Sequence, residues 1–124
     1  MALYRLSEPA KADISAILQR SEQFYGRDAR TRYRACLSAA MRRVAAEPEG
    51  LLTKDQAALF PGVRSFHIRH SRNESLEAPV ANPVHVIFFR ETQSGFIEII
   101  RVLHDRMEPG RHIGREGEAS DAPS

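Results

Sequence analysis

Two strongly apolar runs in the last third of the chain, residues 85–90 and 96–104, constrain the fold more than any other feature. The first reads His-Val-Ile-Phe-Phe-Arg and the second Phe-Ile-Glu-Ile-Ile-Arg-Val-Leu-His, with a short Thr-Gln-Ser-Gly connection at 92–95. Two such runs joined by a short turn that contains glycine are typical of a β-hairpin. A mixed basic and apolar group begins at the last residue of the second run: His104, Arg106, Met107, Arg111 and His112. The sequence therefore predicts a buried hairpin that ends in a cationic cluster.

The start of the chain predicts a short strand and then a helix. Tyr4 and Leu6 alternate with their neighbours as in a half-buried strand. Ser7 stands at a favourable N-cap position, and the apolar residues that follow recur at helical spacing up to Gly26. We therefore expect a first helix over Glu8–Tyr25.

A second helix is expected directly afterwards, with Asp28 as its N-cap and Pro48 beyond its end. Its apolar positions again recur at helical spacing. They are Tyr33, Leu37, Ala40, Met41 and Val44. The two helices then form a tight hairpin.

The remaining segments complete the expected architecture. Residues 47–63 carry mixed signals and predict a loop across the edge of the core, residues 64–70 alternate like a half-buried strand, and residues 71–83 predict an exposed loop. The order predicts an α+β fold: an N-terminal strand, a helical hairpin, and a three-stranded antiparallel meander packed on the two helices. We expect one domain at 1–112 and a disordered acidic tail at 113–124.

Composition places limits on the class of protein. A chain of 124 residues that is 42% hydrophobic can close a core without disulfides, and its one cysteine together with the lack of a signal segment predicts a cytoplasmic protein. Sixteen of the eighteen basic residues are arginine, which favours an anionic partner, although a net charge of +2 also fits an ordinary solvated surface. No cofactor is expected. A metal site is not expected either, because His67 and His70 would face opposite sides of a strand.

Four segments in a fixed order carry a resemblance to a known family. They are Tyr-Arg-Leu-Ser at 4–7, Pro-Gly-Val-Arg-Ser at 61–65, Val-His-Val-Ile-Phe-Phe-Arg at 84–90, and Ile-Glu-Ile-Ile-Arg-Val-Leu-His-Asp-Arg-Met-Glu-Pro at 97–109. Together they resemble the ParE branch of the RelE/ParE superfamily, the small toxins of type II toxin–antitoxin pairs. The string at 102–109 is the most specific of them.

The resemblance implies a non-enzymatic toxin that inhibits DNA gyrase and is neutralised by a ParD-like antitoxin, with DNA contacted only through that antitoxin. The cationic cluster defined above is then the expected target-binding surface. Arg64 and Arg90 flank strands and could bind an antitoxin carboxylate, although a salt bridge within the fold fits them equally well.

Two alternatives remain open. RelE-like members cleave messenger RNA on the ribosome, and His104 or His112 with Arg101 and Arg106 could assemble such a nuclease. Against it, His85 stands where those enzymes carry an arginine, and the lysines and C-terminal tyrosine that they use are mostly missing. The other alternative is a non-catalytic nucleic-acid-binding module, against which no row of stacking aromatics is evident on the expected sheet.

Overall fold

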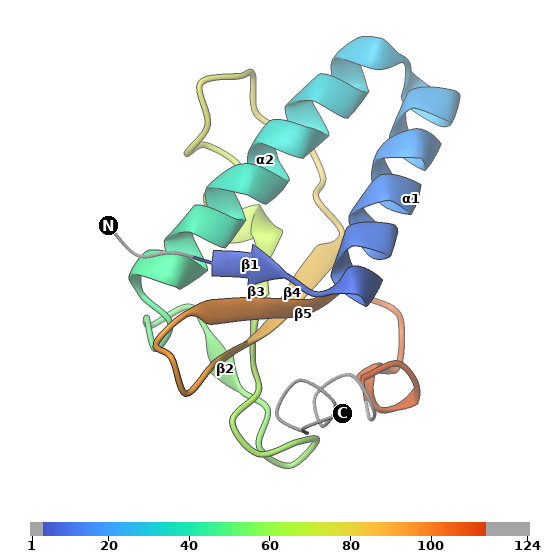
Figure 1. The fold of residues 1–124 in the computed structure, drawn as a ribbon. Coiled ribbons are helices and arrows are strands. Elements are labelled where there is room, and N and C mark those ends of the chain that lie inside the picture. The colour runs from blue at the N-terminus through green and yellow to red at the C-terminus, as the bar shows by residue number, and fades with distance from the viewer. Residues whose placement is uncertain (1–3, 114–124) are drawn as a thin grey trace.

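A five-stranded sheet carries two helices on one of its faces (Figure 1). The computed structural model describes residues 4–113. Its elements are, in chain order, β1 (Tyr4–Leu6), α1 (Glu8–Tyr25), α2 (Arg27–Ala46), β2 (Lys54–Asp55), β3 (Arg64–His67), the 3-10 turn η1 (Ile68–Ser71), β4 (His85–Glu91), β5 (Ile97–His104) and the 3-10 turn η2 (Pro109–Arg111). The predicted α+β class is confirmed.

The sheet has the strand order β1-β5-β4-β3-β2. The predicted antiparallel meander is present as β3, β4 and β5, and β2 extends it by one short strand where a loop was expected. A strand of two exposed residues is too short to show an alternating pattern, so sequence periodicity could not indicate it. β1 pairs with β5 in parallel, and the sheet is therefore mixed. Alternation in β1 indicated its buried face but neither its partner nor its direction.

The helical hairpin has the predicted first helix. Ser7 caps α1, since its Oγ accepts a hydrogen bond from the Ala10 amide at 3.1 Å. Gly26 alone separates the two helices, and its positive φ of 93° allows the tight reversal. Asp28 was predicted to be the N-cap of α2. This prediction was wrong, because the helix already begins at Arg27. Asp28 lies in the first turn, where its charge favours the positive helix end.

β3 is shorter than the predicted strand at 64–70. The chain turns into η1 after His67, whose Nδ1 accepts a hydrogen bond from the Arg69 amide at 3.1 Å. Ile68 remains fully buried in this turn, against the helices. The apolar positions were therefore identified correctly, and the backbone conformation after His67 was not.

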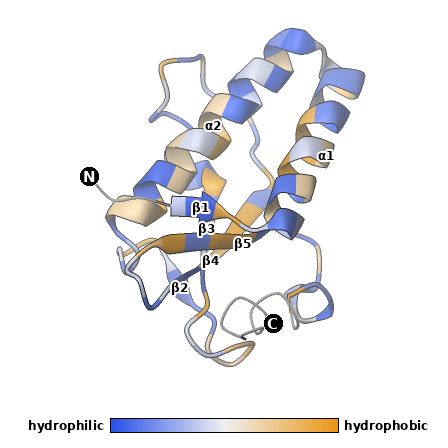
Figure 2. Cartoon of the chain, in the orientation of Figure 1, coloured by the Kyte–Doolittle hydropathy of each residue, from blue (hydrophilic) through white to orange (hydrophobic). Residues whose placement is uncertain are grey.

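Apolar side chains form a core on each face of the sheet, and β4 and β5 are among the most hydrophobic ribbons of the molecule (Figure 2). The larger core lies between the sheet and the helices. The smaller core, on the outer face, consists of Val63, Phe88, Ile100, Leu103 and Ile113.

Ile113 is completely buried, so packing extends one residue beyond the expected boundary at 112. The rest of the predicted tail, 114–124, lies outside the described residues. No helix within residues 4–113 combines the length and the apolar character needed to cross a membrane.

Candidate functional site

The predicted target-binding residues lie on one short segment that runs from the end of β5 through η2. We call His104, Arg106, Met107, Arg111 and His112 the C-terminal cluster. Three of its members are exposed, Arg106, Met107 and Arg111, and 46% of Met107 is accessible to solvent. The two histidines are half-buried. Exposed arginine and methionine side chains are suited to contact with another protein.

Hydrogen bonds fix the backbone of this segment. The amide of Asp105 donates to the Val84 carbonyl at 2.7 Å, and the amide of Met107 donates to the His104 carbonyl at 2.9 Å. The Arg106 amide donates to Nδ1 of His104 at 3.1 Å. Further along, the Ile113 amide donates to the Pro109 carbonyl at 3.0 Å. The exposed side chains are therefore presented from a well-anchored turn.

Arg101 ties this segment to β5 and α1. Its Nε and Nη2 donate to the two carboxylate oxygens of Asp13 at 2.7 and 2.9 Å, and its Nη1 donates to the His112 carbonyl at 2.8 Å. A β-bulge at Ile100 of β5, opposite Phe88 and Phe89 of β4, shifts the register next to Arg101. The guanidinium thus holds the architecture together, which argues against the role of a phosphate-binding cation that the nuclease alternative gave it.

Asp105, which lies within the C-terminal segment but was not singled out by the sequence, anchors that segment to β3. Its Oδ2 accepts a hydrogen bond from Nε2 of His67 at 3.0 Å. Nδ1 of His67 accepts from the Arg69 amide, so the neutral ring carries its proton on Nε2. The hydrogen bond from His67 lowers the pKa of Asp105. Both ring nitrogens of His67 are engaged, and neither is free to act as a base.

His85 is the structural residue that the sequence favoured. The Tyr33 hydroxyl accepts a hydrogen bond from the Val84 amide at 3.1 Å and shares a second hydrogen bond with Nδ1 of His85 at 2.5 Å. Burial, with the nearby His104 as a smaller cause, lowers the pKa of His85 to about 4. Burial likewise raises the pKa of Tyr33 to about 12. Both groups are therefore neutral at pH 7, and neither has a pKa suited to proton transfer near neutrality.

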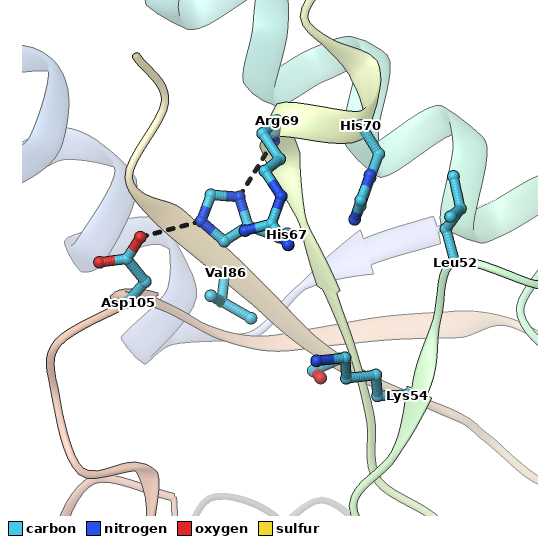
Figure 3. A pocket seen from close by; sticks show the side chains of 8 residues that line it. Leu52, Lys54, His67, Arg69, His70, Val86 and Asp105 are labelled. Atoms are coloured by element: carbon cyan, nitrogen blue, oxygen red, sulfur yellow. Dashed lines mark hydrogen bonds and ion pairs between the residues drawn. The ribbon is translucent and has the colours of Figure 1, made fainter.

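A cleft of about 220 Å³ on the outer face of the sheet is a site that the sequence did not reveal (Figure 3). We call it the outer cleft. Its polar lining is mostly basic and consists of Lys54, Ser65, His67, Arg69, His70 and Asp105. Desolvation and the neighbouring cations lower the pKa of His70.

The His67-x-x-His70 spacing was the available signal for this cleft. The two histidines were expected to face opposite sides of a strand. This expectation was wrong, because the chain turns at His67 and both side chains line the same cleft. Even so, residues 4–113 hold no group of three or more histidine, cysteine, aspartate or glutamate side chains that could bind a metal.

The two predicted antitoxin-binding arginines share a shallow cleft of about 290 Å³, which Phe89 and Glu91 also line. Arg90 is buried, and its Nε lies 3.2 Å from Oε1 of Glu98. Arg64 is half-buried, and its Nη2 donates to the Thr53 hydroxyl at 2.8 Å. Arg90 thus forms a salt bridge within the fold, which was the alternative to antitoxin binding for these two arginines. Arg64 is the more accessible of the two.

Comparison with known proteins gives a consistent family. The family described as "ParE toxin of type II toxin-antitoxin system, parDE" matches residues 4–109. Toxin ParE1 of Caulobacter vibrioides is 33% identical over 114 residues, which cover 92% of this chain and 100% of that protein. Toxin ParE1 of Mycobacterium tuberculosis is 29% identical over 110 residues, covering 89% of this chain and 96% of the relative. The match extends from β1 to the start of η2, and the chain therefore belongs to the ParE toxin family of type II toxin–antitoxin systems.

Proposed function

We propose that this toxin inhibits DNA gyrase in the cytoplasm by protein–protein contact through the C-terminal cluster, and that a ParD-like antitoxin neutralises it. The observation that carries the proposal is the exposure of Arg106, Met107 and Arg111 on a hydrogen-bonded segment anchored by Arg101. Arginine and methionine at such a surface bind a protein target without any chemical step.

The state of the candidate catalytic groups supports a non-enzymatic mechanism. Cleavage of RNA through its 2′-hydroxyl needs a base, an acid and cations placed at one phosphate. Arg101 is committed to Asp13, and His85 is neutral and hydrogen-bonded to Tyr33. His104 uses its Nδ1 to accept the Arg106 amide, which leaves only Nε2 for proton transfer. Of the nuclease set that the sequence allowed, Arg101 is therefore engaged in holding the fold, and His104 has one of its two ring nitrogens committed.

The antitoxin part of the proposal rests on the accessible arginine of the shallow cleft. Arg64 lies beside the exposed edge strand β2, whose unpaired backbone groups could accept an added strand. An acidic antitoxin segment that folds on binding would place a carboxylate against Arg64. Binding that is confined to the folded toxin would also raise its melting temperature.

The outer cleft is the one observation that favours a second function, a ribosome-dependent endoribonuclease. Lys54, Arg69 and His70 could contact a phosphate there, although both nitrogens of His67 are already engaged. This alternative requires RNA to enter the outer cleft, whereas the gyrase proposal leaves that cleft without a role.

Two assays on one preparation separate the functions. Purified toxin should block supercoiling by gyrase and accumulate cleaved plasmid, while programmed ribosomes keep their messenger RNA intact. Cleavage of messenger RNA with gyrase unaffected would replace the first function by the second. Activity in neither assay, from a preparation that still binds its antitoxin, would contradict both.

A further inference from the structure

Helix α2 carries a row of exposed arginines that neither the gyrase proposal nor the nuclease alternative uses. We call Arg27, Arg34 and Arg42 the arginine ridge. At about 100° per residue, the three positions fall within an arc of about 80° on the helix surface. With a rise of about 1.5 Å per residue, the ridge is about 22 Å long. All three side chains are exposed, and the turns near the tip of the helical hairpin are mostly hydrophilic (Figure 2).

The charge of the ridge is not balanced locally. An ordinary solvated helix face mixes charges of both signs. Within residues 4–113, none of the three arginines has a carboxylate in ion-pair distance. The nearby Glu22 is already paired with Arg30 at 2.9 Å. Asp28 follows Arg27 directly and so points about 100° away from it around the helix. The ridge is therefore a row of three uncompensated positive charges.

An exposed aromatic pair stands at one end of this ridge, at the tip of the helical hairpin. Phe24 is 61% and Tyr25 80% accessible, far more than aromatic residues that belong to a core. Their ring centroids lie 6.5 Å apart, and the guanidinium of Arg20 lies 5.2 Å from the Phe24 ring centroid. Arg27 follows two residues after Tyr25. The tip therefore joins stacking surfaces to a cationic row.

This combination selects nucleic acid over an acidic peptide. A peptide that folds on binding needs apolar surface to bury. The positions that lie between the arginines on this face of the helix are instead the polar residues Thr31, which is exposed, and Ser38, which is half-buried. The two clefts described above are lined by residues outside α2. A row of guanidinium groups can bind the phosphates of a nucleic-acid backbone without any apolar contact. Exposed aromatic rings can stack on the bases of a single strand.

We propose that the arginine ridge binds the phosphate backbone of single-stranded nucleic acid and that Phe24 and Tyr25 stack on its bases. The binding would be independent of base sequence, because a ridge that contacts only phosphates reads no base edges. This surface is separate from the C-terminal cluster, and the proposal does not depend on the gyrase function.

Fluorescence anisotropy with labelled oligonucleotides of about 15 nucleotides, the upper range of one single-strand site, tests this proposal. The full chain is titrated alone and in complex with its antitoxin, against single-stranded DNA, single-stranded RNA and duplex DNA. We expect micromolar affinity for single strands and a log–log salt slope of about −2, from three phosphate contacts at about −0.7 each. A preference for DNA or RNA would identify the natural ligand within this class.

Two variants and one control make the test specific. The triple variant Arg27→Ala, Arg34→Ala, Arg42→Ala should bind at least about tenfold more weakly and lose most of the salt slope, and alanine preserves the helix. The control removes the same charge elsewhere, as Arg5→Ala, Lys11→Ala, Arg30→Ala, and should keep most of the affinity, because each of these exposed cations is already paired with a carboxylate.

The stacking part has its own variant, Phe24→Ala with Tyr25→Ala. It should weaken single-strand binding about fivefold or more and leave duplex binding unchanged. Equal losses in the ridge and control triples would show only non-specific charge attraction and overturn the proposal. Tighter binding of a polyglutamate peptide than of the oligonucleotides, or no oligonucleotide binding at all, would also overturn it.

Discussion

Replacing Asp13 by alanine is expected to destabilise the fold strongly. The carboxylate of Asp13 accepts hydrogen bonds from Nε and Nη2 of Arg101 and from the Val102 amide, at 2.7 to 2.9 Å. The side chains of Asp13 and Arg101 are only 15% and 16% exposed, so water replaces these bonds poorly. Removal of Asp13 leaves a mostly buried guanidinium without its counter-charge and the Val102 amide without its hydrogen-bond acceptor.

The expected loss in free energy of unfolding is about 3 kcal/mol, the low end of the range for breaking a buried ion pair, because this pair keeps some solvent contact. For a domain of this size, that loss lowers the melting temperature by about 12 °C. Thermal and urea unfolding followed by circular dichroism measure both quantities. Hydrogen exchange at residues 104–113 should also rise, since Arg101 holds the His112 carbonyl.

A matched control uses the same helix. Glu22→Ala removes an ion pair with Arg30 whose side chains are each 44% exposed, and it should cost less than about 1 kcal/mol. The apolar double variant Asp13→Leu with Arg101→Met should recover much of the stability lost in Asp13→Ala, because no charge is left buried. An Asp13→Ala loss as small as that of the control would refute the role of this ion pair.

Three further predictions concern the core, pH and the partner. Ile113→Ala should lower the free energy of unfolding in urea by about 3 kcal/mol, as for other buried aliphatic residues. A chain that ends at Ile113 should have the melting temperature of the full chain, and a large decrease on truncation would show that 114–124 contributes to the fold. The folded pKa of His85, about 4, lies below its unfolded value of about 6.5, so its contribution to stability is complete above pH 6.5 and is lost as the pH falls towards 4. His85→Gln should therefore make unfolding less sensitive to pH, by about 1–2 kcal/mol between pH 7 and 5, and an unchanged pH profile would contradict the assigned cause. Co-expression with a ParD-like antitoxin should yield a complex with a raised melting temperature, and Arg64→Ala should weaken it; an affinity unchanged by Arg64→Ala would remove this residue from the interface.

The parts of the fold that sequence patterns predicted are those where one residue period persists over many positions. The hairpin of β4 and β5 and the helix α1 are long enough for their patterns to be clear. The two-residue strand β2 and the turn η1 are too short for any period, and the smaller core depends on Ile113, which lies far in sequence from Val63. These features depend on tertiary contacts, which local patterns do not record.

The candidate site was predictable to a smaller extent. The C-terminal cluster could be located because its residues are consecutive or nearly so after a clear strand. The pairing of Arg101 with Asp13 joins residues 88 positions apart, and a β-bulge sets the register at Arg101, so no spacing rule could indicate it. The outer cleft was missed because the bend at His67 reverses the expected direction of His70.

Accumulation of cleaved plasmid by gyrase is the measurement that bears most directly on the mechanism. Arg106→Ala with Met107→Ala should abolish most of the accumulation while leaving the fold and antitoxin binding intact, because both side chains are exposed. Lys54→Ala with Arg69→Ala, which changes the outer cleft instead, should act on gyrase like the wild type. The opposite pattern, with activity lost in the outer-cleft variant and retained in the cluster variant, would contradict a target-binding role for the C-terminal cluster.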